Sequence, residues 1–250
     1  MMGMPLLASK HGAEVDRLIF YVHLLMAVLF VGWLGYFLYA LLRFRKSSNP
    51  KASYTGVTSH ASTYVEGAVA LIEAVLLIGF AVPLWAKMAD AFPADKDATV
   101  IRVTAEQFAW NARYPGKDGK FGQQDIKLVS PSNPLGYDPK DPAAKDDIIP
   151  ALNEMTVPLG KPVITYITSK DVIHSFKILP FRITQDAIPG LVIPLWFDPT
   201  QAGHYIINCA QLCGNSHYFM RGAFHVVSPE DYEKWVAEKS KAGSGPVSFE

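Results

Sequence analysis

Both cysteines of the chain lie in one segment of twelve residues, which also contains other potential metal ligands. The segment reads Cys209-Ala-Gln-Leu-Cys213-Gly-Asn-Ser-His217-Tyr-Phe-Met220. Thiolate and thioether sulfurs select copper, and imidazole suits copper as well. Blue-copper sites use one Cys, two His and a weak axial Met, whereas a second Cys would let two sulfurs bridge two metal ions. The segment therefore predicts a copper site that serves electron transfer.

A second imidazole is needed to complete this ligand set. His174, within Asp171-Val-Ile-His-Ser-Phe, is the leading candidate. His204 and His225 fall at or within predicted strands and are interpreted as ordinary barrel or surface histidines. His23 lies inside an apolar run and is interpreted as a helix-packing or boundary residue.

Two other uses of the cysteines are open. An oxidising compartment would favour a disulfide between Cys209 and Cys213, but such a small loop would constrain the unfolded chain little. Zinc sites of the Cys2His2 type usually separate a C-x2–4-C pair from a distant H-x3–5-H pair. The softness of the ligands favours copper over both alternatives.

Two long apolar runs lie within the first 86 residues of the chain. The 250 residues carry 23 basic and 23 acidic side chains, so the zero net charge gives no reason to expect a nucleic-acid partner. Leu18 to Leu42 contains no charged residue and is long enough to cross a bilayer core of about 30 Å. Val65 to Ala86 is interrupted only by Glu66 and Glu73. Both runs are predicted to be transmembrane helices.

The loop between the two runs predicts their orientation. Residues 43–64 include Arg43, Arg45, Lys46 and Lys51 and no acidic residue, so this loop is predicted to be cytoplasmic and both termini external. The predicted organisation is an outer N-terminal tail (1–17), transmembrane helix 1 (18–42), a cytoplasmic loop (43–64), transmembrane helix 2 (65–87), an external domain (88–228), and a C-terminal helix and tail (229–250).

The external part has the pattern of an all-β domain. Beyond Pro93, short β-branched and aromatic runs are punctuated by Pro and Gly, which is typical of a small sandwich or barrel. Residues 115–150 form a Pro-, Gly-, Asp- and Lys-rich insertion, predicted to be a functional loop or a poorly ordered segment. Ser228-Pro-Glu-Asp then predicts the start of the C-terminal helix, with Ser as its N-cap.

Two N-terminal spans followed by an external β domain with these ligands resemble subunit II of the haem–copper cytochrome c oxidases. Four motifs carry the resemblance in the family's order: Asp171-Val-Ile-His-Ser-Phe, Asp186-Ala-Ile-Pro-Gly, Leu195-Trp-Phe and Cys-Ala-Gln-Leu-Cys-Gly-x-x-His-x-x-Met. The resemblance implies a cupredoxin-like β-barrel, external to the membrane, that bears the binuclear copper A centre.

The resemblance also implies which residues bind the two copper ions: His174, Cys209, Gln211, Cys213, His217 and Met220. By resemblance, Cys209 and Cys213 bridge the metals and each His binds one. Met220 and the backbone carbonyl of Gln211 would be weak ligands. The family usually has Glu at position 211, where its side chain helps bind magnesium at the subunit I interface. A neutral amide is a poor substitute for that carboxylate, so a magnesium ion here would need its charge from subunit I.

Aromatic residues near the first predicted strand resemble the family's electron-accepting cluster, Gln-Trp-x-Trp-x-x-x-Tyr. The chain reads Gln107-Phe108-Ala-Trp110-Asn-Ala-Arg-Tyr114, with Phe108 in place of the first Trp. Electrons would then arrive over the Phe108 surface or at Trp110. Packing alone is the alternative for all three aromatic residues.

The two acidic residues of the second span receive different interpretations. Glu66 matches the family's Glu at the mouth of a proton path into subunit I. Glu73 stands where the family often has Pro, so the resemblance gives it no role.

The predicted function is that of subunit II of a terminal oxidase. By resemblance, it accepts electrons from cytochrome c and passes them to the haem of subunit I, where oxygen is reduced to water with proton translocation. Subunit III is a further expected partner. The expected location is a plasma (inner) membrane, with both termini and the copper domain on the periplasmic side.

Three alternatives differ in testable features. A membrane-anchored copper-delivery or thiol-redox protein is the runner-up, but such proteins have a thioredoxin-like βαβ pattern and one span. A quinol oxidase subunit II lacks the copper ligands. Nitrous-oxide reductase shares the copper A motif but needs a large propeller domain.

Overall fold

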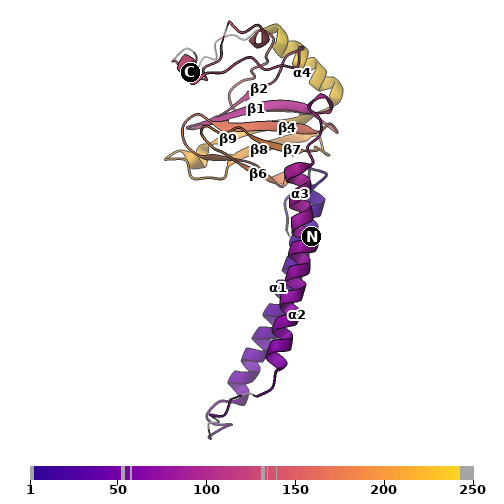
Figure 1. Ribbon diagram of the computed structural model, residues 1–250, viewed down its shortest axis with the longest axis vertical. Coiled ribbons are helices and arrows are strands. Elements are labelled where there is room, and N and C mark those ends of the chain that lie inside the picture. Colours follow the sequence, from indigo (N-terminus) through magenta and orange to yellow (C-terminus); the bar gives the residue numbers. More distant parts are fainter. Residues whose placement is uncertain are drawn as a thin grey trace. The chain divides into compact units, whose positions relative to one another are not determined.

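The computed structural model describes residues 3–51, 54–56, 58–130, 133, 135–138 and 140–242. The chain forms two compact units, one comprising Glu14–Lys87 and the other comprising Met1–Ala13 with Met88–Glu250 (Figure 1). The predicted tail after the C-terminal helix, from residue 243 onward, lies outside the described residues.

The helical unit consists of two long apolar helices. Helix α1 spans Gly12–Arg43, and the second helix runs through α2 (Ala61–Leu76), a π-helical turn η1 (Leu77–Ala81) and α3 (Val82–Asp90). Their most apolar windows have mean hydropathies of 2.2 and 2.3, and no residue of those windows is buried within the protein. Apolar helices whose side chains are not covered by the rest of the protein are suited to a lipid environment. By length and composition, both helices can cross a membrane.

Pro83 lies within the second helix and does not end it. Proline lacks a backbone N–H and its ring clashes with the carbonyl four residues earlier. The π-helical turn immediately before Pro83 widens the backbone, and the N–H of Val82 bonds to the carbonyl of Leu77, five residues back. This wider turn lets the helix continue to Asp90.

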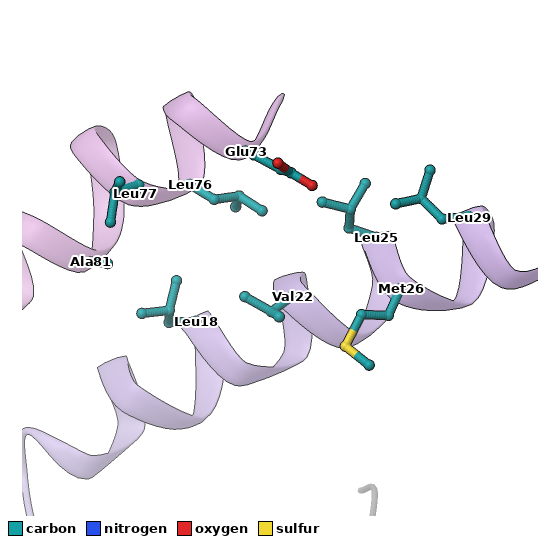
Figure 2. A pocket seen from close by; sticks show the side chains of 9 residues that line it. All are labelled: Leu18, Val22, Leu25, Met26, Leu29, Glu73, Leu76, Leu77 and Ala81. Carbon is teal, nitrogen blue, oxygen red and sulfur yellow. The ribbon is translucent and has the colours of Figure 1, made fainter. Parts of the chain in front are cut away.

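Glu73 faces α1 within the helical unit. A pocket of about 310 Å³ lies between the two helices, and Figure 2 shows the Glu73 carboxylate pointing toward Leu25. The lining is otherwise apolar: Leu18, Val22, Leu25, Met26, Leu29, Leu76, Leu77 and Ala81.

The external unit is a sandwich of two sheets. One has the strand order β2-β1-β4-β7, and the other has the order β3-β9-β8-β5-β6. The strands of the first are β1 (Thr99–Glu106), β2 (Ala109–Arg113), β4 (Val163–Ser169) and β7 (Ile193–Phe197). Those of the second are β3 (Glu154–Pro158), β5 (His174–Ile178), β6 (Ile183–Ala187), β8 (Gly203–Cys209) and β9 (Arg221–Val227). The β1/β4 and β3/β9 pairs are parallel, and the other pairs are antiparallel.

An aromatic cluster forms the centre of the core between the sheets. Phe181, Phe197 and Phe224 are fully buried, with ring centroids 5.3–5.8 Å apart. Such tilted and edge-on pairs are the geometries that aromatic rings prefer. The close-packed core holds β5 and β8, the two strands that carry His174 and Cys209, in a fixed relation.

The C-terminal helix α4 (Pro229–Ala242) closes one side of the sandwich. Its predicted N-cap is present, since the hydroxyl of Ser228 accepts the Asp231 N–H at 3.1 Å. Trp235 packs edge-on against Tyr114, with ring centroids 5.1 Å apart. Short 3-10 turns connect the remaining elements at Asp95–Asp97, Ile126–Leu128, Pro142–Ala144, Leu179–Phe181 and His217–Phe219.

The 115–150 insertion, where it is described, folds around a buried ion pair. Arg113 in β2 and Asp147 expose only 2% and 1% of their side chains. The Arg113 Nε–H donates to Asp147 Oδ2 at 2.8 Å, and the Gly122 N–H donates to the same oxygen at 3.0 Å. The ring of Tyr137 lies 4.4 Å from the Arg113 guanidinium. These contacts tie the insertion to the edge of the four-stranded sheet.

A candidate metal centre

Two neighbouring strands and one loop position the soft ligands. His174 begins β5 and Cys209 ends β8, and the antiparallel register places Phe176 opposite Cys209. The chain then turns through residues 210–220 and returns as β9. The Cys209 N–H donates to the carbonyl of Met220 at 3.3 Å, which closes the base of this loop. All six predicted ligands therefore lie at one end of the five-stranded sheet.

The donor atoms converge to within a few ångströms of one another. The two cysteine sulfurs are 3.7 Å apart, and Cys209 Sγ lies 3.9 Å from His174 Nδ1. On the other side, Cys213 Sγ lies 3.5 Å from His217 Nδ1 and 3.8 Å from Met220 Sδ. The backbone carbonyl oxygen of Gln211 is 3.2 Å from Cys209 Sγ, while its side chain is exposed. Each cysteine sulfur thus has one imidazole beside it, His174 for Cys209 and His217 for Cys213.

The centre is nearly closed to solvent. His174 is fully buried, Met220 and Cys213 expose 1% and 4%, and Cys209 and His217 are half-buried. Both cysteines are free thiols. Their separation far exceeds the length of a disulfide bond, which is about 2.05 Å.

The two thiols have opposite electrostatic environments. Burial opposes ionisation of Cys209, but hydrogen bonds from His174 and from backbone groups of Ser175 and Gln211 lower its pKa to about 6. Burial and the neighbouring Cys209 sulfur raise the pKa of Cys213 to about 12. Without metal, therefore, the pair holds one thiolate and one thiol at neutral pH. A bound cation would favour deprotonation of both sulfurs.

An acidic side chain that the ligand pattern did not identify orients His174. Asp171 Oδ1 lies 2.9 Å from His174 Nε2, so the other ring nitrogen, Nδ1, faces the sulfurs. Asp171 Oδ2 accepts the backbone N–H of Gln107 at 2.7 Å. Despite its partial burial, Asp171 has a lowered pKa because of these hydrogen bonds. Carboxylates that bond to the far nitrogen of a ligating His fix the ring and its tautomer.

Gln107 links the β1–β2 turn to the ligand loop. Its side-chain Nε2–H donates to the Cys213 carbonyl at 2.6 Å. Phe108 is partly buried, and its ring lies beside Gly214, where an added Cβ would sit 2.9 Å from Phe108 Cζ. Gly214 also has a φ of +139°, so this position requires glycine for two reasons.

Trp110 and Tyr114 lie in different surroundings. Trp110 is fully buried and packs edge-on against His174, with ring centroids 6.2 Å apart. The Tyr114 hydroxyl donates to the Thr156 carbonyl at 2.9 Å, and its ring contacts Trp235 of α4. The fold thus brings Trp110 to the ligand cluster, whereas Tyr114 packs beneath α4. Glu66 is exposed on α2 in the helical unit.

The donor set fits copper. His174, Cys209 and Cys213 offer ligand atoms that all lie within 4.8 Å of one another, as required of a group that holds a metal ion. His217 and Met220 add a second imidazole and a thioether beside Cys213. Sulfur and imidazole donors select a soft or borderline metal, whereas hard Mg²⁺ and Ca²⁺ require oxygen.

Comparisons with known proteins agree with this chemistry. Residues 99–227, more than half of the chain, match the family described as cytochrome c oxidase subunit II, periplasmic domain. An alternative cytochrome c oxidase subunit 2 from Bradyrhizobium diazoefficiens is 34% identical over 208 residues, which are 83% of this chain and 73% of that protein. Cytochrome c oxidase subunit 2 from Cereibacter sphaeroides is 30% identical over 226 residues, and the match covers 84% of this chain and 71% of that protein.

A solved structure is also similar. The periplasmic domain of subunit II of cytochrome oxidase from Bradyrhizobium japonicum is 31% identical, with a TM-score of 0.43. The match covers 58% of the present chain and 94% of the chain in the solved structure.

The chain belongs to the cytochrome c oxidase subunit II family. It is therefore a subunit of an oxidoreductase complex and associates with other oxidase subunits. The predicted fold class is confirmed: two long apolar helices precede a cupredoxin-like β domain, which is an open two-sheet sandwich, and a helix follows it. The apolar helices and the periplasmic family domain indicate a membrane-anchored protein with an external domain.

Proposed function

We propose that this chain accepts single electrons from cytochrome c at a binuclear copper A centre and delivers them to the haem of subunit I. Oxygen reduction and proton translocation would take place in that partner. The observation that carries the proposal is the convergence of two free thiols 3.7 Å apart, each beside its own imidazole. A blue-copper site would need only one of these sulfurs.

The six ligands proposed for the two copper ions are His174, Cys209, Gln211 through its carbonyl, Cys213, His217 and Met220. When bound, such a centre takes up and releases one electron that is shared by two metals, so the bonding changes little. The protein keeps the ligands in place by different means. The β5–β8 pairing holds His174 and Cys209, and the hydrogen bond from Cys209 to Met220 closes the loop.

Two residues are proposed to carry electrons toward the centre. Phe108 is partly exposed and packs on Gly214, the residue after Cys213, and Trp110 packs on His174. Both aromatic surfaces thus adjoin ligand-bearing segments, which supports a role in electron acceptance. Tyr114 is proposed to act by supporting this region through its contacts with Thr156 and Trp235.

The copper-delivery alternative receives less support from the fold. It requires a thioredoxin-like βαβ unit, whereas the ligands here lie on a two-sheet sandwich. It also requires one span, and the described residues include two helices that can cross a membrane.

The test is electron transfer in the assembled oxidase. Cys213→Ser removes one proposed bridging sulfur, so we expect the rapid oxidation of reduced cytochrome c to be lost in stopped-flow measurements. A small chemical reductant should still reduce the haem of subunit I, which shows that the haem itself remains competent. The matched control is His204→Asn, an exposed imidazole on β8 outside the ligand set. Rapid cytochrome c oxidation by the Cys213→Ser complex would contradict the proposal.

A further inference from the structure

Two histidines outside the proposed copper ligands form a close pair on the surface of the external domain. His204 in β8 and His225 in β9 are directly opposite each other in the antiparallel register. Their Nδ1 atoms are 2.6 Å apart, and their ring centroids are 4.8 Å apart with an interplanar angle of 78°. From the sequence, each was interpreted as an ordinary barrel or surface histidine, and 20 residues separate the two in the chain.

The pair lies on the outer face of the five-stranded sheet. Successive strand residues point to opposite faces, and Tyr205 and Ile207 are buried while His204 and Ile206 are exposed. On β9, Phe224 and Val226 are buried on either side of half-buried His225. Strands β8 and β9 run side by side in this sheet (Figure 1). Both imidazoles are therefore held by rigid backbone and remain reachable from solvent.

We propose that His204 and His225 chelate a borderline divalent transition-metal ion, such as Zn²⁺ or Cu²⁺. Imidazole nitrogen suits these ions, and Cu²⁺ would bind most tightly. Metal–nitrogen bonds of about 2.0–2.1 Å place two imidazole donors on one ion about 2.9–3.4 Å apart. The Nδ1 atoms therefore need to separate by less than about 1 Å, which small side-chain rotations provide.

The surroundings of the two imidazoles favour binding of a metal cation over protonation of both rings. At 2.6 Å, only one of the two facing nitrogens can carry a hydrogen, so the other presents a lone pair. Burial, and then the proximity of His204, lower the pKa of His225, and metals bind the neutral imidazole. Glu154 in β3 is exposed and pairs with Ala223, two positions before His225, so its charge lies on the same face. Water molecules would complete the coordination.

This site is separate from the proposed copper centre. His204 and Cys209 are five residues apart on β8, which corresponds to roughly 17 Å along a strand. The inference therefore does not depend on what the thiols bind.

The test is a calorimetric titration of the copper-loaded, full-length chain in detergent with Zn²⁺. The unmodified chain should bind one Zn²⁺ at this pair. His204→Asn and His225→Asn should each weaken this binding roughly 100-fold, because a chelate becomes a single ligand. The double variant keeps neither imidazole and should show no Zn²⁺ binding at this position. Chain with both thiols blocked by alkylation should behave in the same way, which separates this site from the copper centre.

Matched controls define the site. His60→Asn removes an exposed imidazole from the helical unit and should leave the affinity for Zn²⁺ unchanged. Mg²⁺ should not compete, because it prefers oxygen ligands. Zn²⁺ should raise the melting temperature of the unmodified chain and fail to raise that of the double variant. Unchanged Zn²⁺ affinity in the double variant, or equal effects of His60→Asn and His225→Asn, would overturn the proposal.

Discussion

The two cysteines are chemically different although they are four residues apart. Cys209 lies at the end of a strand, where His174 and backbone groups stabilise its thiolate. Cys213 is buried in the loop beside that thiolate, which disfavours a second negative charge. This asymmetry is a property of the metal-free protein, and it gives each sulfur its own reactivity.

The first prediction concerns that reactivity in the metal-free, full-length chain. The pKa of Cys209 is lowered from 9.0 to about 6, so its thiolate forms as the pH rises through about 6. Alkylation of Cys209 by iodoacetamide should therefore increase between pH 5 and pH 7 and then level off, while Cys213 reacts far more slowly. Peptide mass spectrometry measures both rates, with the denatured chain as the control. Equal rates for the two cysteines that keep rising toward pH 9 would refute the asymmetry.

The sequence could identify the metal-ligand candidates but not all of the groups that orient them. Cys209, Cys213, His217 and Met220 share one loop, so their types and spacing carried the prediction. The role of Asp171 depends on a turn that returns its carboxylate to His174 Nε2. The Asp-x-x-His spacing was visible, but many such spacings make no contact. The His204–His225 pair was missed for a related reason, because the pairing register of β8 and β9 cannot be derived from either strand alone.

Among the structural elements, the 115–150 insertion is one whose conformation could not be predicted from its composition. Its Pro, Gly, Asp and Lys content fits either a functional loop or a poorly ordered segment. The described residues instead pack around Arg113 and Asp147, a pair that stands 34 residues apart in the chain. A buried charge is costly unless it is paired, so this contact selects one arrangement of the insertion.

The second prediction tests that ion pair. Arg113→Ala leaves the Asp147 carboxylate buried without its partner and should cost about 3–5 kcal/mol of stability. The double change Arg113→Met with Asp147→Leu replaces both charges by apolar groups and should recover most of the loss. Thermal unfolding of the full-length chain, followed by near-ultraviolet circular dichroism, measures both effects. A double variant as unstable as Arg113→Ala would show that the charges themselves are needed.

The second apolar helix shows a different limit of prediction. Its length and composition indicated a span, but the effect of Pro83 depended on a local change of helix type that the sequence did not specify. The same helix carries two carboxylates at different positions. Both are exposed, but Glu73 lines the apolar pocket toward α1 in Figure 2, whereas Glu66 lies near the start of α2 and outside that lining.

The third prediction separates these carboxylates. We propose that Glu66 lies at the mouth of a proton path into subunit I. Glu66→Gln should then slow proton uptake and oxygen turnover of the assembled oxidase by roughly 10²-fold, a typical effect of removing a proton-transferring side chain. Glu73→Gln is the matched control and should leave turnover near its original value. Proton uptake is followed with a pH indicator dye. Normal turnover in the Glu66→Gln complex would exclude this role for Glu66.

At the scale of the whole molecule, one chain combines a membrane anchor with a rigid external site. The helical unit supplies two apolar helices that are long enough to cross a membrane. The sandwich supplies a close-packed frame that holds the ligands at one end of the five-stranded sheet. A rigid frame suits the proposed electron transfer, because ligands that move little on reduction keep the barrier low. Under this proposal, no substrate bond has to be made or broken at the site.

The proposed copper A centre requires the two sulfurs to bridge a pair of copper ions, and electron paramagnetic resonance of the copper-loaded, full-length chain can detect such a pair. We expect two copper ions per chain and one unpaired electron shared equally between them, with a hyperfine pattern from both nuclei. A signal from a single copper ion, or a disulfide between Cys209 and Cys213 in the active protein, would contradict it.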